Sequence, residues 1–192
     1  MNIQKLTQKS IEAIQNAQSI AIENQNAQIE QEHLLLALLE QDNSLIRELL
    51  KKMGVSENFE DAIRNIISRK PRMSGGTRPN DSIYVSQDVD LVLNNAEKIA
   101  LKMKDEYVSV EHIMLSLFDY ANSELKEIFK TYGITKNEFL KALSSVRGNT
   151  RVTTDNPEET YDSLKKYGQD LVRLAREQKL DPVIGRDTEI RN

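Results

Sequence analysis

The sequence predicts an all-α fold in which a four-helix unit occurs twice in tandem and the two copies pack as a pseudo-symmetric pair. The main observation is a repeat, because the pair Glu32-His33 recurs 79 residues further along as Glu111-His112. When residues 6–58 are aligned with residues 85–137 without a gap, 15 of the 53 positions are identical. A single offset that holds over this length indicates an internal duplication.

The apolar residues of the first copy have helical spacing. Thr7 is a predicted N-cap, because its hydroxyl accepts from backbone N–H groups that have no partner inside the helix. After it, the apolar residues between positions 11 and 21 fall on one helical face. Residues 34–39 are apolar nearly all round, which predicts a short helix at the centre of the core.

Two further helices complete each copy. A third apolar stripe covers residues 45–53 and ends at Gly54, since glycine adopts the left-handed conformation that ends a helix without a Cβ clash. Residues 59–67 give a fourth stripe. The second copy repeats the order, with Ser86 in the place of Thr7 and Gly133 in the place of Gly54.

Proline and glycine divide the rest of the chain. Two prolines and a Gly-Gly pair predict a surface loop between the copies, and a polar stretch that ends at Pro157 predicts a linker after them. The unit after that linker is too short to bury a core of its own. The predicted boundaries are a repeat domain at 1–147 (copy one 1–69, loop 70–82, copy two 83–147), a linker at 148–157 and the truncated start of another domain at 158–192.

Composition excludes several classes of function. The 192 residues include 30 acidic and 26 basic side chains, no Cys and no Trp. The absence of Cys removes disulfides, thiol catalysis and Cys-based zinc sites. An acidic chain with 5% aromatic residues argues against nucleic-acid binding. No apolar run approaches the roughly 20 residues that cross a bilayer, and the start lacks a signal-peptide core. We expect a cytoplasmic protein that binds neither nucleic acid nor membrane.

The sequence offers little for catalysis. His33 and His112 are its two histidines and begin equivalent helices, so they are predicted to cap or pack rather than to hold a metal, and no HExxH spacing occurs. No G-x-S-x-G is present, and no glycine is followed by lysine as a Walker A loop requires. We therefore predict no catalytic residue, no metal and no cofactor in this chain.

Two groups of residues carry a resemblance to a known family. The repeated Glu-His pair in two four-helix copies resembles the N-terminal domain of Clp-type AAA+ unfoldases. The run Lys-Leu-Asp-Pro-Val-Ile-Gly-Arg-Asp at residues 179–187 is similar to the opening of their first ATPase module, and residues 156–171 are similar to the segment that leads into it. The resemblance implies a full-length homohexamer that uses ATP and magnesium to thread polypeptide through a pore, and an isolated fragment that is monomeric. It also implies that Val183 and Ile184 contact the adenine base in the full-length protein.

Within the family, the chain most resembles the disaggregase branch. That resemblance implies binding of unfolded or aggregated proteins, and cooperation with the DnaK chaperone system through other parts of the full-length protein. It places a polar cluster at Thr7, Asp105 and Glu111, with Leu93 and Tyr107 as the apolar wall of a groove. His112 departs from the pattern, since some relatives carry an apolar groove residue there.

Other interpretations stay open at this point. Thr7 serves equally as a simple N-cap, Asp105 as a solvated loop charge and Glu111 as a helix-start charge. The alternative function is docking of an adaptor by the N domain of a protease-linked Clp unfoldase, and a third is a structural cap over the pore. A long coiled-coil middle domain beyond residue 192 would favour the disaggregase.

Overall fold

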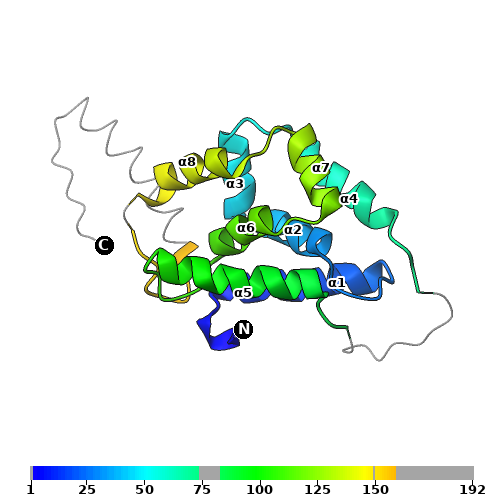
Figure 1. Ribbon diagram of the computed structural model, residues 1–192, viewed down its shortest axis with the longest axis horizontal. Helices are drawn as coiled ribbons and strands as arrows, with labels where there is room; N and C mark the ends of the chain where they lie inside the picture. The colour runs from blue at the N-terminus through cyan, green and yellow to red at the C-terminus, as the bar shows by residue number, and fades with distance from the viewer. Residues whose placement is uncertain (1, 74–82, 149, 159–192) are drawn as a thin grey trace. The chain divides into compact units, whose positions relative to one another are not determined.

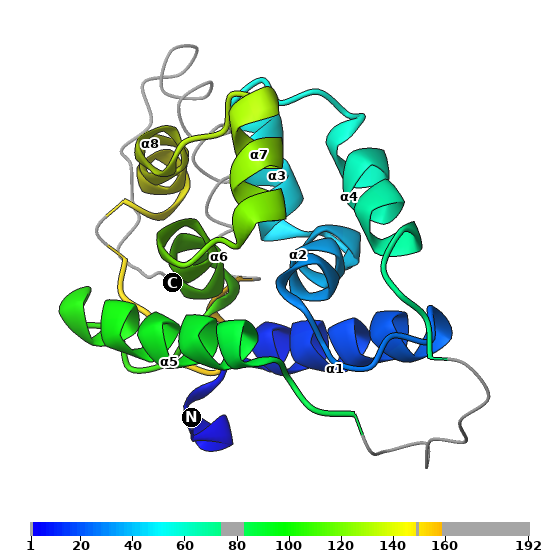
Figure 2. The same ribbon diagram turned by 45° about the vertical axis from the view of Figure 1, so that its right-hand side comes forward.

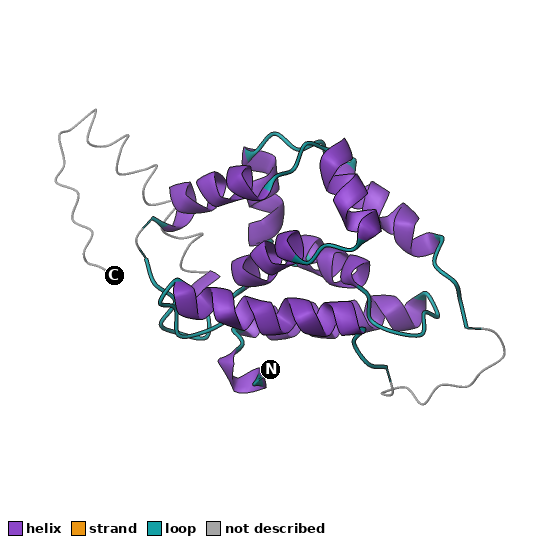
Figure 3. Ribbon diagram, in the orientation of Figure 1, coloured by secondary structure: helices purple, strands orange, loops and turns teal. Residues whose placement is uncertain are grey.

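This computed structural model describes residues 2–73, 83–148 and 150–158. The named elements within these ranges are eight α-helices and one short 3-10 helix (Figure 1). Among these residues there are two isolated β-bridges and no strand, so the all-α prediction is confirmed (Figure 3). The elements are a 3-10 helix at Ile3–Lys5 and the helices α1 Gln8–Glu23, α2 Gln31–Glu40, α3 Leu45–Lys52, α4 Phe59–Ser68, α5 Gln87–Lys102, α6 Val110–Asp119, α7 Ser123–Thr131 and α8 Lys136–Arg147.

The predicted repeat is visible in the order of the helices, because α1 to α4 correspond to α5 to α8. Thr7 and Ser86 are the N-caps of α1 and α5, and each hydroxyl accepts from the backbone N–H three residues on, at 3.2 Å. Gly54 and Gly133 follow α3 and α7 with φ of 79° and 67°. These values confirm that glycine ends both helices in the left-handed region.

The two helices that begin with the repeated Glu-His pairs, α2 and α6, lie at the centre of the core. Figure 2 shows α2 and α6 between a layer formed by α1 and α5 and the remaining four helices. Residues 31–39 of α2 and 110–117 of α6 are all buried. Far from α1 and α5, aromatic rings join the two copies, since Phe59 of α4 stacks on Phe129 of α7 with ring centroids 6.3 Å apart.

The two copies also exchange backbone hydrogen bonds just before their helices begin. The Val108 N–H donates to the Lys5 carbonyl at 2.7 Å, and the Thr7 N–H donates to the Val108 carbonyl at 3.0 Å. The same pattern recurs where Ile29 and Ser86 make the equivalent bonds to Tyr84 and Ile29. We call these places the α1/α6 junction and the α5/α2 junction, after the helices whose N-terminal ends meet there.

Residues up to Glu158 belong to one compact unit. The described part of the predicted linker is hydrogen-bonded to the repeat domain at the α1/α6 junction. Residues 159–192, which include Val183 and Ile184, lie outside the described residues. No helix within the described ranges is long and apolar enough to span a bilayer.

Candidate functional site

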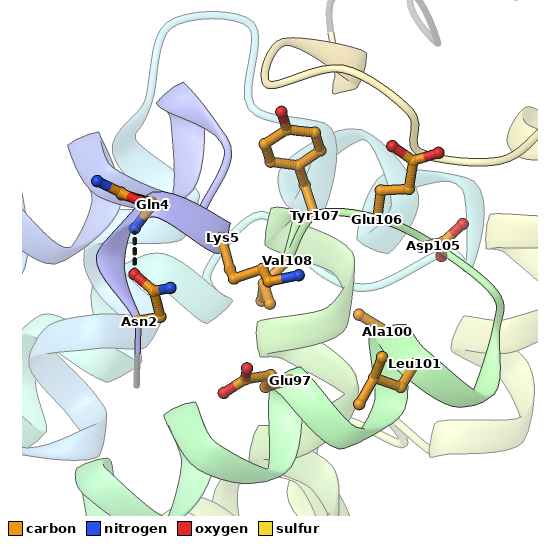
Figure 4. Close-up of a pocket in the computed structure, with 10 residues that line it drawn as sticks. All are labelled: Asn2, Gln4, Lys5, Glu97, Ala100, Leu101, Asp105, Glu106, Tyr107 and Val108. Carbon is orange, nitrogen blue, oxygen red and sulfur yellow. Dashed lines mark hydrogen bonds between the residues drawn. The ribbon is translucent and has the colours of Figure 1, made fainter.

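A groove of about 470 Å³ opens beside the α1/α6 junction. Three elements line it: the N-terminal segment, the last turns of α5 and the loop at residues 105–108 that leads into α6 (Figure 4). Leu101 of α5 is 67% exposed at this groove, and Tyr107 is half-buried. The lining therefore combines exposed apolar surface with polar groups. The lining residues are Asn2, Gln4, Lys5, Glu97, Ala100, Leu101, Asp105, Glu106, Tyr107 and Val108.

Asp105 connects the groove to a buried polar cluster. Its Oδ2 accepts from His112 Nε2 at 2.7 Å, and its Oδ1 accepts from the backbone N–H of Val152 at 2.9 Å and from Arg147. Burial alone would raise the pKa of this carboxyl, but the hydrogen bonds from His112, Arg147 and Val152 lower the pKa of Asp105 to about 2. Asp105 is therefore an ionised acceptor at neutral pH.

Arg147, at the end of α8, holds two carboxylates together. Its guanidinium bonds Asp105 and also donates to Glu111 Oε2 at 3.2 Å. The side chains of both acids are completely buried and that of Arg147 is 3% exposed. A guanidinium with several fixed donors suits two carboxylates that point to it from different directions.

Residues 150–158, which we call the strap, cross this junction in contact with its backbone. The Glu106 N–H donates to the Val152 carbonyl at 2.7 Å, and the Gln8 N–H donates to the Asp155 carbonyl at 2.7 Å. Val152 is completely buried. The strap thus contributes hydrogen-bonded backbone and the buried side chain of Val152 to the junction, and its Pro157 is buried as well.

Glu158, the last residue of the strap, inserts a second acid beside Glu111. Its Oε2 accepts from the Thr7 hydroxyl at 2.6 Å and from the Val110 N–H in the first turn of α6 at 3.1 Å. Burial, and next the negative charge of Glu111, raise the pKa of Glu158 to about 7. Within the described residues, one oxygen of each of these two carboxyls is buried without a hydrogen bond.

The structure brings together most of the residues that the sequence singled out. Thr7, Asp105 and Glu111 meet at the junction, and Tyr107 lines the adjoining groove. Leu93 is 8% exposed in the hydrophobic core and is not among the residues that line the groove.

Three participants were missed by sequence reasoning. Arg147 is the last residue of a helix and Glu158 follows a polar linker, so neither shows a periodic pattern. Leu101 is an exposed leucine at the groove, next to the predicted core face of its helix. The one available signal was Val152, an isolated apolar residue within a polar stretch.

With this geometry established, comparison with known proteins decides the family. A family model described as the Clp repeat (R) N-terminal domain matches residues 5–132. The chain belongs to this family. The match includes both copies of the Glu-His pair and most of the residues that form the α1/α6 junction of this Clp N domain.

Relatives that match over the whole chain include chaperones named ClpB. Those of Bacillus cereus and Clostridium tetani are 41% and 42% identical over 192 residues, which is all of this chain and 22% of each relative. The chain thus spans about a fifth of the length of the curated relatives that it matches.

Solved structures support the same fold. The Hsp104 N-terminal domain from Candida albicans has a TM-score of 0.71 at 26% identity, over 80% of this chain and 99% of that one. A ClpV N-domain in complex with a VipB peptide has a TM-score of 0.56 at 24% identity, over 74% of this chain and 86% of that one.

The two histidines of the Clp N domain cap helices, as predicted. Nδ1 of His33 accepts the Glu30 N–H at 2.8 Å, and Nδ1 of His112 accepts the Ser109 N–H at 2.9 Å. A ring nitrogen that accepts an N–H carries no proton, so Nε2 of each ring is the donor, to Asn26 in the first copy and to Asp105 in the second. Neither histidine lines the groove. No three His, Asp or Glu side chains within the described ranges form a group that could hold a metal ion.

Proposed function

We propose that this Clp N domain binds unfolded or aggregated polypeptide in the groove beside the α1/α6 junction, for delivery to the threading pore of a full-length disaggregase. The observation that carries the proposal is the groove itself. It is about 470 Å³ in volume and combines the exposed Leu101 with the half-buried Tyr107 and the ionised Asp105. Exposed apolar surface rimmed by polar groups is typical of sites that bind other polypeptides.

The loop at residues 105–108 suits a ligand of no particular sequence. It holds the backbone of Val152 through a carboxylate acceptor and an N–H donor, and main-chain contacts of this kind do not depend on the side chains of the bound segment. Apolar contacts with Leu101 and Ala100 read general hydrophobicity. Such binding is expected to be weak, with a Kd on the order of 10 µM. Several domains on one ring would raise the overall affinity.

We also infer the role of the remaining protein from the ClpB relatives. In this proposal, the full-length chain is a cytoplasmic homohexamer in which ATP and magnesium act in domains beyond this one. Val183 and Ile184 would contact adenine there, and cooperation with the DnaK system would involve other regions. Thr7 and Glu111 would form the polar end of the binding site, next to Asp105.

The test compares two exposed leucines on one helix. Leu101 lines the groove and is 67% exposed, whereas Leu91 is 50% exposed and is not among the lining residues. Leu93 is a poorer choice, because a polar residue at this buried position would disturb the core. Carboxymethylated α-lactalbumin, which stays unfolded, would be titrated into the isotope-labelled 192-residue chain and followed by NMR.

We expect saturable shifts around Leu101 and Tyr107, a several-fold loss of affinity in Leu101→Ser, and wild-type affinity in Leu91→Ser. Equal losses in both variants would point to non-specific hydrophobic contact. Absence of binding at millimolar concentration would argue for the alternative function, in which the domain docks an adaptor.

A further inference from the structure

The strap occupies the α1/α6 junction in the manner of a bound peptide. The Val152 N–H donates to the Asp105 carboxylate, and the Val152 carbonyl accepts from the Glu106 N–H. Asp105 and Glu106 both line the groove. Three residues further on, the Asp155 carbonyl accepts from the Gln8 N–H at the start of α1. The strap therefore crosses from the loop before α6 to the first turn of α1.

The strap ends in a carboxyl group that the junction does not supply by itself. At the α5/α2 junction the N-cap of α2 is Glu30, whose own carboxylate is hydrogen-bonded to Ser86. At the α1/α6 junction the N-cap of α6 is Ser109, and the Thr7 hydroxyl bonds Glu158 instead. The repeat thus uses a carboxyl at both places, and at the α1/α6 junction a separate segment provides it.

We propose that the α1/α6 junction is a docking site for a peptide with a small apolar residue and, six positions later, a carboxyl side chain, and that the strap is its resident ligand. The inference deepens the proposed function and rests on it in one respect: an incoming polypeptide that uses Asp105 and the Glu106 N–H must first displace Val152. The strap then competes with substrate, and its release opens the polar end of the groove.

The contacts of the strap suit a ligand that can leave. Of its residues, Val152, Pro157 and Glu158 are buried, while Thr153, Thr154 and Asp155 are exposed. Glu158 also lies beside a second buried acid, Glu111, and the two carboxyls repel each other when both are ionised. The raised pKa of Glu158 is consistent with this unfavourable placement.

The experiment uses the 192-residue chain and two matched pairs of variants. Val152→Asp places a charge next to Asp105, and Glu158→Ala removes the terminal carboxyl, so both should release the strap. Thr153→Asp and Asp155→Asn change exposed side chains of the same segment and serve as controls. The probes are carboxymethylated α-lactalbumin and a fluorescent peptide with the strap sequence Thr-Arg-Val-Thr-Thr-Asp-Asn-Pro-Glu, alongside a version that ends in Ala.

We expect the release variants to bind the labelled strap peptide more tightly than the wild type and the controls do, and to prefer it over the Ala version, which lacks the acceptor for the Thr7 hydroxyl and the Val110 N–H. They should also bind unfolded α-lactalbumin about tenfold more tightly, if the strap is docked nine-tenths of the time. Unlabelled strap peptide should compete with α-lactalbumin. Unchanged amide shifts in α3 and α4 would show that each variant is folded.

The outcomes separate this inference from the proposed function. Failure of the strap peptide to bind the folded release variants would overturn the inference, whether or not α-lactalbumin binds. Binding of the peptide, without binding of α-lactalbumin to any variant, would support the docking site and overturn the proposed function. Equal affinity of wild type and release variants for α-lactalbumin would overturn the competition.

Discussion

The two junctions of the Clp N domain share their backbone hydrogen bonds and differ in the charges that they bury. Both contain a fully buried glutamate, Glu111 in one and Glu32 in the other. Asp105 at the α1/α6 junction corresponds to Asn26 at the α5/α2 junction, and both accept from a capping histidine. The duplication therefore fixes the path of the backbone, while the side chains decide what each junction can hold.

The difference extends to the segment that leaves each copy. Asn26 donates through its amide to the Pro71 carbonyl at 3.1 Å, whereas Asp105 accepts from the Val152 N–H. An amide can donate and accept, but an ionised carboxylate only accepts. The α1/α6 junction therefore needs more donors than its counterpart, and Arg147 is the donor that meets this need for two acids.

The largest expected effect comes from removing that cation. Arg147→Met keeps much of the side-chain volume but leaves Asp105 and Glu111 buried without their positive partner. We expect a loss of about 3–5 kcal/mol in the free energy of unfolding, as for other buried ion pairs that lose one member. Urea denaturation at pH 7 followed by circular dichroism measures it.

The matched variant at the α5/α2 junction is Lys70→Met. Lys70 Nζ lies 3.0 Å from Glu32 Oε1, and its side chain is 14% exposed. One buried carboxylate rather than two loses its partner, so we expect about half the effect. Equal losses of unfolding free energy in Arg147→Met and Lys70→Met would show that the second buried acid at the α1/α6 junction does not increase the stabilisation that its cation provides.

The next prediction concerns the pH dependence of strap docking at the α1/α6 junction, which among the described residues has no counterpart at the α5/α2 junction. Glu158 has a pKa of about 7 when the strap is docked and an ordinary value of 4.5 in solvent, so the docked state binds the proton more tightly. Docking is then strongest at low pH and weakens as the pH rises through 7. Between pH 5 and pH 8 we expect the strap to lose about 2–3 kcal/mol of docking free energy.

Hydrogen exchange of the Glu106 and Gln8 amides, corrected for the intrinsic effect of pH, measures this change. Both amides donate to the strap. The groups that face Glu158 are Glu111, the Thr7 hydroxyl and the Val110 N–H. Asp105 stays ionised in this range because its pKa is about 2. Glu158→Gln should abolish the pH dependence, and a wild type whose protection is constant from pH 5 to pH 8 would contradict the prediction.

The fold was accessible from the sequence because its signals are local or repeated. Thr7, Ser86, Gly54 and Gly133 each end or begin a helix through their own chemistry, and the constant offset transfers every assignment from one copy to the other. The capping role of His33 also follows from its place three residues after an N-cap.

The site was accessible only in part, because its contacts join residues far apart in sequence. The resemblance to relatives pointed to Thr7, Asp105 and Glu111, which do meet. Nothing local in the sequence marks Arg147 or Glu158 as their partners, since a salt bridge across 36 residues leaves no periodic pattern. The docking of a polar segment depends on unsatisfied donors and acceptors that appear only after the helices have packed.

The smallest expected effect is a loss of folding stability at low pH, caused by protonation of His33 at the α5/α2 junction. Burial, and next the charge of Lys70, lower the pKa of His33 from 6.5 to about 4. The unfolded chain then binds this proton more tightly than the folded one, so stability is present above pH 6.5 and falls as the pH drops towards 4. Protonation would also place a proton on Nδ1, which accepts the Glu30 N–H.

We expect the wild type to lose about 2 kcal/mol more than His33→Gln between pH 7 and pH 5, measured by urea denaturation at both values. Glutamine suits the third position of a capping box and does not titrate, so it isolates the proton. An equal loss in both proteins would mean that another group drives the acid response. The expected result gives the two junctions opposite pH responses, because acid weakens the one built around a neutral histidine and strengthens the one closed by the strap.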